Sequence, residues 1–397
     1  MASADVMPMA TSVTTFEPLE SSTAGKRKRS TDKVLIDVGA LASVPKVPFD
    51  ASKHVTFTSP SKVYTMKDLS LPEDCGISPV AVSEPFPLFS PEAIQQMRAE
   101  VLSKDVWENC QYSSNLSQCQ LRGMAPEFAP FIYDAWRNPK VLENISKVAG
   151  VDLVPEMDFE IGHINISMQS EEQKQEALAA IAEKEARQAD EGVAGCPWED
   201  DTPIVDWHTD SYPFVCVLML SDCTKMIGGE TALRTGTGEV MKVRGPQMGC
   251  AVILQGRYIE HQALRALGAC ERITMVTSFR PKSAMIKDDT VLTTVRPISD
   301  LSELYFQYSE YRLEILEERL RAHLKDIRER KRANRSFDTA STKRFLKEQQ
   351  DFLAAMNREM VDEANVIQGY CDDSHLLSED LRAKSKKPRT ASPEETT

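Results

Sequence analysis

The sequence predicts an α+β fold: a double-stranded β-helix (jelly roll) core backed by N-terminal helices, with a C-terminal helical extension. Two apolar stretches, residues 214–220 and 251–254, have the length of β-strands, and glycine-rich turns such as Gly228-Gly229 separate the strand-like segments. Short strands joined by such turns are typical of antiparallel sheets folded into a roll that holds a small site. The extension is predicted by apolar residues at three- and four-residue steps after residue 300.

The composition divides the chain into five parts. Residues 1–55 are rich in Ser, Thr, Ala and Pro without a steady apolar period, which predicts a disordered tail. The jelly-roll domain is expected over 80–290, with a charged, alanine-rich insertion at 169–195 that predicts a solvated helix, either a lid or an exposed addition. A helical hairpin is expected over 300–368, and a second disordered tail over 370–397.

Two helices are predicted before the main strands. Ser90 is a capping residue, and Pro91 and Glu92 suit the first turn of the helix that follows. A second helix is expected to begin at Pro139. Their apolar residues recur at helical spacing and would face the sheet: Ile94, Met97 and Val101 in the first helix, and Val141, Leu142, Ile145 and Val148 in the second.

A strand is predicted between Phe159 and Met168, where apolar residues alternate and Gly162 marks a bulge. His163 and Asn165 share one face of this strand because side chains repeat every two residues. Either residue could be a site residue or a hydrogen-bonded core group.

The C-terminal third predicts two paired helices, joined across residues 334–341. The predicted apolar seam consists of Leu313, Leu316, Leu320, Leu324 and Ile327 on the first helix and Phe345, Phe352, Met356 and Met360 on the second. Three alternatives remain open for residues 310–360: a homo-oligomer or protein-partner surface, a basic helix for an acidic partner, or a flap packed on the roll.

Charge and cysteine content limit the classes of function. The net charge is −13, which argues against broad nucleic-acid binding, although a local basic patch could still bind. The nine cysteines contain no Cys-x-x-Cys pair, and no apolar run approaches the ~18 residues of a membrane span, so we expect an intracellular protein outside the membrane. The cytoplasm is the favoured location. Basic runs at 26–29 and 384–389 make the nucleus the alternative.

The most informative motif is His208-Thr209-Asp210 with a later His261. A histidine and an aspartate two residues apart on an extended strand point to the same side, and a second histidine on another strand can complete a three-ligand set. Two histidines and one carboxylate leave positions on ferrous iron open for oxygen and an oxidisable co-substrate. Downstream, Arg272 and Thr274 offer a guanidinium and a hydroxyl that can grip a carboxylate.

The segment 205–281 resembles the iron(II)- and 2-oxoglutarate-dependent dioxygenases, whose motif is His-x-Asp, about fifty residues, His, about ten residues, and Arg-x-Ser or Arg-x-Thr. The motif covers about a fifth of the chain, and weaker likeness extends over 80–283. The resemblance implies that His208, Asp210 and His261 are the iron ligands and catalytic residues. It also implies that Arg272 and Thr274, with Asn165 as a further candidate, bind 2-oxoglutarate.

The resemblance implies an oxidoreductase that uses Fe(II), 2-oxoglutarate and O2 to oxidise a C–H bond, with release of succinate and CO2. A small-molecule substrate is favoured, because the acidic chain shows no extended basic groove. The alternatives are an oxygenase for protein residues or nucleic acid, and a non-catalytic jelly-roll scaffold that binds partners through its C-terminal helices.

Overall fold

The computed structural model describes residues 44–117, 119–168, 203–224, 226–267 and 271–381. It also describes two short paired strands, β1 (Thr14–Phe16) and β2 (Val34–Ile36), and single helical positions at Gln175 and Ala179. Apart from those two positions the predicted insertion lies outside the described residues, as do both basic runs.

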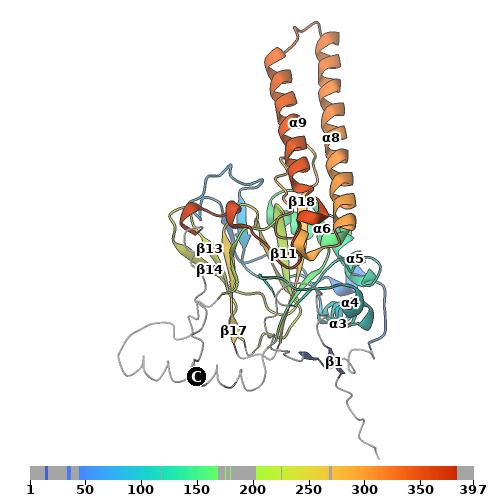
Figure 1. Ribbon diagram of the computed structural model, residues 1–397, viewed down its shortest axis with the longest axis vertical. Coiled ribbons are helices and arrows are strands. Elements are labelled where there is room, and N and C mark those ends of the chain that lie inside the picture. The colour runs from blue at the N-terminus through green and yellow to red at the C-terminus, as the bar shows by residue number, and fades with distance from the viewer. Residues whose placement is uncertain are drawn as a thin grey trace, which may run out of the picture.

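Two antiparallel sheets form the centre of the molecule (Figure 1). The strands of the larger sheet lie in the order β3 (Val63–Thr65), β4 (Val80–Ser83), β15 (Cys250–Leu254), β11 (Phe214–Met219), β18 (Glu271–Pro281), β9 (His163–Met168), β7 (Gln120–Leu121) and β6 (Gln111–Tyr112). Two further strands join it, β5 (Phe86–Pro87) on β15 and β8 (Leu153–Pro155) on β18.

The smaller sheet has the order β10 (Pro203–His208), β16 (His261–Leu264), β13 (Thr231–Arg234) and β14 (Val240–Val243). A separate pair is formed by β12 (Ile227–Gly228) and β17 (Ala266–Leu267). The structure therefore shows the antiparallel, sheet-rich part of the predicted α+β fold.

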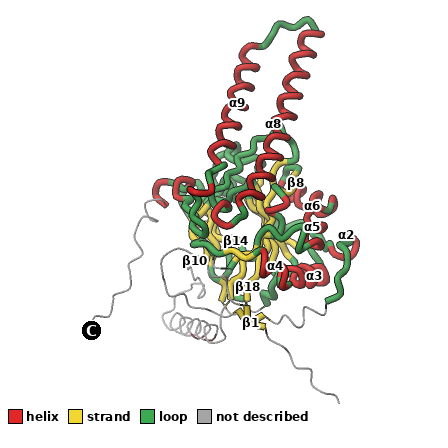
Figure 2. Tube along the Cα trace, turned by 45° about the vertical axis from the view of Figure 1, so that its right-hand side comes forward, coloured by secondary structure: helices red, strands yellow, loops and turns green. Residues whose placement is uncertain are grey.

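Helices cover the outer face of the larger sheet (Figure 2): α3 (Pro91–Val101), α4 (Lys104–Asn109), α5 (Pro130–Arg137) and α6 (Pro139–Ala149). Both predicted helix starts are confirmed. The Ser90 hydroxyl accepts a hydrogen bond from the amide of Ala93, and Asn138 caps the helix that begins at Pro139. Ile94, Trp136 and Ile145 pack in one buried core with Met275 of β18.

The opposite face of the larger sheet looks toward the smaller sheet. Val215 of β11 and Val252 of β15 share a second buried core with Leu233 of β13, and Val276 of β18 packs against it. Because side chains alternate along a strand, every second residue of β18 faces this space. The space between the sheets is therefore lined by apolar side chains at one end and by polar side chains further along β18.

The C-terminal hairpin consists of α8 (Leu301–Arg332) and α9 (Thr339–Glu359), and it extends beyond the sheets (Figures 1 and 2). Only its foot is well buried, where Tyr308 and Ile315 pack with Phe352. Three leucines of the predicted seam remain about half exposed: Leu313 (51%), Leu320 (47%) and Leu324 (46%). They stay exposed because this part of α8 lies beyond the sheets, and α9 alone cannot cover its apolar seam. No helix in the described part is both long and apolar enough to span a membrane.

Two stretches inside the predicted tails have defined positions. Near the N-terminus, α2 (Ala51–His54) follows Phe49, and the rings of Phe49 and His54 lie 5.4 Å and 5.1 Å from that of Phe131. Near the C-terminus, Cys371 and Leu377 are buried. The sequence did not indicate this packing because such isolated apolar residues produce no period.

Candidate active site

The structure brings His208, Asp210 and His261 together at one end of the smaller sheet. His208 ends β10, His261 begins β16, and the two are register partners. Asp210 lies two residues beyond His208, where its amide donates to the carbonyl of Gly256 at 2.9 Å. The imidazole centroids are 4.3 Å apart, and one side-chain ligand atom from each of the three residues lies within 4.8 Å of the others.

Backbone contacts fix which nitrogen each histidine presents. Nδ1 of His208 lies 2.8 Å from the carbonyl oxygen of Asp206, and Nδ1 of His261 lies 2.8 Å from that of Ile259. Since a carbonyl can only accept, each Nδ1 carries the hydrogen and donates it. In the neutral ring this leaves the lone pair on Nε2, the atom that each histidine turns toward Asp210.

The separations suit a shared cation better than direct hydrogen bonds. Nε2 of His208 is 3.6 Å from Oδ1 of Asp210, and Nε2 of His261 is 3.5 Å from Oδ2, both longer than ordinary hydrogen bonds. Oδ2 of Asp210 is buried and has no hydrogen-bond partner in the described part of the chain. Ligands held ~2.1 Å from one ion at right angles lie ~3 Å apart, so a small contraction of this cluster would accommodate a divalent metal.

The charges of the cluster are consistent with a cation site. Burial by itself would raise the pKa of Asp210, but His261 and His208 outweigh burial and hold the pKa well below its usual value. Asp210 therefore stays ionised. Burial acts to lower the pKa of His208, yet the carboxylate of Asp210 overcomes it and leaves this pKa raised.

Gly256 makes room for the carboxylate. A Cβ atom at residue 256 would lie 1.7 Å from Oδ2 of Asp210 and 2.6 Å from its Cγ. No other residue type fits beside Asp210 without displacing it. The sequence analysis did not identify Gly256, which lies five residues before His261 in a turn that resembles any other glycine turn.

Arg272 and Thr274 lie on β18 of the facing sheet, and Asn165 lies on β9. Thr274 is the register partner of Asn165, and Arg272 is two residues along on the same side. That side faces the smaller sheet, because the intervening Ile273 packs with the outer helices. The three predicted co-substrate residues and the His-Asp-His cluster thus belong to faces that look toward each other.

Arg272 differs from Arg257 and Arg280, the competing candidates for binding a carboxylate. Its Nε is buried and finds no hydrogen-bond partner among the residues that the structure describes, and burial lowers its pKa. By contrast, Arg280 donates to the carbonyl of Glu156 and lies over the ring of Tyr311, while Arg257 donates to the carbonyl of Asp289. A buried guanidinium with an unused donor is suited to binding an anion.

A polar network that the sequence analysis missed adjoins Asn165. The side-chain amide of Gln120 donates to Oδ1 of Asn165 at 3.4 Å and lies 3.3 Å from Nε2 of His163. On the other side of His163, Arg122 donates to Nδ1 at 2.9 Å. Burial and the charge of Arg122 lower the pKa of His163 to about 3, so this ring is neutral.

Behind His163, Arg122 forms a buried ion pair with Glu160, and the hydroxyl of Tyr212 donates to Glu160 at 2.5 Å. This network orients the polar residues of β9 from behind. Arg122 and Glu160 lie outside any recognisable motif, so no pattern along the chain predicted the pair.

The second missed element is the segment 369–381, here called the C-terminal strap. Near one end, Asn115 and Cys371 exchange two hydrogen bonds of 3.1 and 2.8 Å; near the other, the amide of Ser378 donates to Glu260, the neighbour of His261. Between these two contacts, Asp373 has a buried oxygen, Oδ2, for which the described residues offer no hydrogen-bond partner. In Figure 1 this red segment passes over the ends of the sheets toward β13.

This chain is similar to several solved structures. No family model and no curated protein matches this chain. Similar solved structures include a 2OG-Fe(II) oxygenase family oxidoreductase from Burkholderia pseudomallei (13% identity, 43% of this chain and 64% of that chain, TM-score 0.27). A prolyl 4-hydroxylase from Phytophthora capsici is 14% identical over 74% of this chain and 92% of that chain, with a TM-score of 0.32.

A third similar structure is the non-haem α-ketoglutarate-dependent epimerase SnoN from nogalamycin biosynthesis, 11% identical over 49% of this chain and 75% of that chain, with a TM-score of 0.33. Several structures similar to this chain are therefore 2OG-Fe(II) oxygenases, the family whose motif the sequence resembles. At these identities and TM-scores, the inference of function rests on the site geometry. The aligned part is less than two thirds of the Burkholderia protein.

Proposed function

We propose that this protein is an Fe(II)- and 2-oxoglutarate-dependent oxygenase. The observation that carries the proposal is the convergence of Nε2 of His208, Nε2 of His261 and the buried, unpartnered Oδ2 of Asp210. We also propose that the two sheets form the double-stranded β-helix of such enzymes, with the metal cluster at one end of the smaller sheet.

The residues have distinct roles in this proposal. His208, Asp210 and His261 would hold Fe(II), which supplies oxidative decarboxylation of 2-oxoglutarate and oxidation of a substrate C–H bond by O2. Arg272 would bind the distal carboxylate of 2-oxoglutarate through its unused donor. Thr274 and Asn165, opposite each other on β18 and β9, would supply hydrogen bonds to the same carboxylate.

The protein's own contribution is to position these groups and to exclude water. The backbone carbonyls of Asp206 and Ile259 hold the imidazoles in the tautomer that binds a metal. The apolar core formed by Val215, Val252 and Leu233 closes one end of the space between the sheets. Exclusion of water strengthens each electrostatic contact within the site.

We propose a small-molecule substrate. The strap supports this proposal, since its contacts with Asn115 and Glu260 hold a peptide segment next to the cluster. This segment would restrict the access of a large substrate to the cluster. Leu376 of the strap also lines a surface pocket together with Thr209, the residue between two of the proposed ligands.

The test is succinate formation from 2-oxoglutarate by protein loaded anaerobically with Fe(II) and then exposed to oxygen. We expect turnover by the wild type, none by His208→Ala, and a greatly raised 2-oxoglutarate requirement for Arg272→Ala. Turnover by His208→Ala at the wild-type rate would show the ligand assignment to be wrong. Failure of the wild type to bind Fe(II) would favour the non-catalytic scaffold.

A further inference from the structure

The tip of the α8–α9 hairpin is a strongly basic surface on an acidic protein. Between residues 325 and 347 there are nine basic residues and three acidic ones, a local net charge of +6, whereas the whole chain carries −13. Residues 302–321 of the same hairpin are different, because Glu310, Glu314, Glu317 and Glu318 are interspersed with Arg312, Arg319 and Arg321. The hairpin therefore carries its excess positive charge only where it extends furthest from the sheets (Figure 1).

Most of the cations at the tip have no acidic partner. Within the described residues, three basic side chains at the tip pair with acids: Lys325 with Glu329, Arg330 with Asp338 and Lys347 with Asp351. The six others are exposed and form no such pair: Arg328, Lys331, Arg332, Arg335, Lys343 and Arg344. Unpaired like charges on one small surface repel one another, so they weaken the isolated hairpin and favour binding of a polyanion.

The helix dipole does not account for this arrangement. Cations in the last turn of α8, such as Lys331 and Arg332, stabilise a helix C-terminus. Lys343 and Arg344 lie near the N-terminal end of α9, where the dipole gives no reason for cations. The same sign at both helix ends therefore points to a ligand rather than to helix stability.

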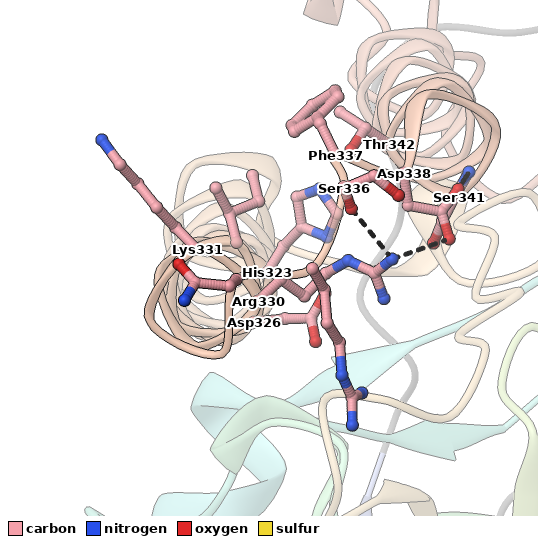
Figure 3. Close-up of a pocket in the computed structure, with 12 residues that line it drawn as sticks. His323, Asp326, Arg330, Lys331, Ser336, Phe337, Asp338, Ser341 and Thr342 are labelled. Atoms are coloured by element: carbon pink, nitrogen blue, oxygen red, sulfur yellow. Dashed lines mark hydrogen bonds and ion pairs between the residues drawn. The ribbon is translucent and has the colours of Figure 1, made fainter.

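The loop between the helices gives the charged surface a defined shape (Figure 3). Arg330 reaches across it, donating to the carbonyl of Ser336 at 3.3 Å and lying 3.8 Å from Asp338. The two helices and this loop border a pocket of about 590 Å³, whose lining includes Arg330, Lys331 and Arg335 together with Ser341 and Thr342. The ring of Phe337 sits on the loop and is 61% exposed.

We propose that the hairpin tip binds single-stranded nucleic acid, with phosphates on the unpaired cations and a base stacked on Phe337. Surfaces that bind single-stranded nucleic acid combine exposed aromatic rings with arginines and lysines, because each base can stack on a ring and each phosphate carries a negative charge. An acidic protein partner would bind the basic side chains, but contact with an exposed aromatic ring would add little to its affinity. This inference concerns a surface separate from the metal cluster and does not depend on the proposed oxygenase activity.

The experiment measures the fluorescence anisotropy of a labelled poly(U) RNA of about 20 nucleotides with the full chain. If about four cations contact phosphates, log K falls with log salt at a slope of about −2.8, so affinity drops roughly 50-fold between about 50 and 200 mM KCl. The triple variant Lys331→Glu, Arg332→Glu, Arg335→Glu should bind at least tenfold more weakly. Phe337→Ala should lose about fivefold and Phe337→Tyr should not, because stacking needs the ring.

A matched control makes the same change of charge at three exposed lysines far from the tip: Lys46→Glu, Lys67→Glu, Lys282→Glu. These three residues form no ion pair within the described part of the chain. We expect the control to bind within about twofold of the wild type at the higher salt concentration, where long-range charge effects are screened. Helical content from circular dichroism shows that each variant is folded.

Three results would overturn the proposal. The first is absence of RNA binding by the wild type at low salt. The second is a tip variant that loses no more affinity for the RNA than the control variant does. That result would assign the affinity to overall charge or to the basic runs at 26–29 and 384–389. The third is a tip-dependent interaction with poly-L-glutamate that matches the RNA in strength and ignores Phe337, which would identify an acidic protein as the partner.

Discussion

Gly256→Ala should weaken metal binding at least 100-fold without unfolding the protein. The added Cβ would lie 1.7 Å from Oδ2 of Asp210, against about 3.4 Å for an ordinary contact, so the carboxylate oxygen must move by roughly 1.7 Å. Metal–ligand distances in real sites vary by only about 0.2 Å. Asp210 would cease to be a ligand. Since even residues that merely support ligands change metal affinity 10- to 100-fold, we expect a loss of at least 100-fold, or about 2.8 kcal/mol.

The backbone of residue 256 does not contribute to this effect. Gly256 is absent from the glycines with positive φ, so alanine is compatible with its conformation. The assay is competition for Fe(II) against a chelating dye under anaerobic conditions, with thermal unfolding measured alongside. We expect the melting temperature to fall by no more than about 4 °C, the effect of about 1 kcal/mol in a domain of this size.

A double-mutant cycle separates the overlap from other causes. In an Asp210→Ala background the added methyl group meets no carboxylate, so Gly256→Ala should then change metal affinity by less than about twofold. Wild-type affinity in the single variant would refute the placement of Asp210 against Gly256. A further large loss in the Asp210→Ala background would show that residue 256 acts by another route.

Three other changes have definite expected results. Arg272→Lys keeps the charge but loses the planar pair of donors, so the KM for 2-oxoglutarate in succinate formation should rise about tenfold with a smaller change in kcat; an unchanged KM would place the carboxylate elsewhere. Glu156 is buried near Asp288, and burial with that neighbouring charge raises its pKa to about 8. Its protonated form is favoured by folding, so unfolding free energy should fall by up to about 1.4 kcal/mol per pH unit between its unfolded pKa and 8; chemical denaturation of Glu156→Gln should lack this slope. Ser378→Pro removes the amide that donates to Glu260 and should increase proteolytic cleavage within the strap while thermal unfolding changes little; protection equal to the wild type would mean that the contact does not hold the strap.

Local signals in the sequence predicted much of the fold. The cap at Ser90 and the proline at residue 139 determined where two helices begin, because these preferences depend on the neighbouring few residues. The alternation around Asn165 predicted which residues of β9 share a face, since side chains on any strand repeat every two residues. The order in which strands pair in the sheets could not be read in this way, as it depends on contacts between distant residues.

The same distinction applies to the site. His208, Asp210 and His261 could be predicted because their residue types and spacing are unusual. Gly256 could not, since its importance comes from the position of a carboxylate 46 residues earlier in the chain. Asp373 lies in a segment whose composition suggested disorder, and contacts between distant residues fix its position, among them the two hydrogen bonds between Cys371 and Asn115 and the one from Ser378 to Glu260.

The order of the parts along the chain has a consequence for biosynthesis. The larger sheet is complete once β18 ends at Pro281, but the strap begins 88 residues later, at residue 369. At ribosomal rates of about 5–20 residues per second, those residues take roughly 4 to 18 s to make. During that interval a nascent chain already contains every proposed ligand, while the segment that will lie beside them has yet to be translated. The proposed metal can therefore reach its ligands before the strap lies beside them.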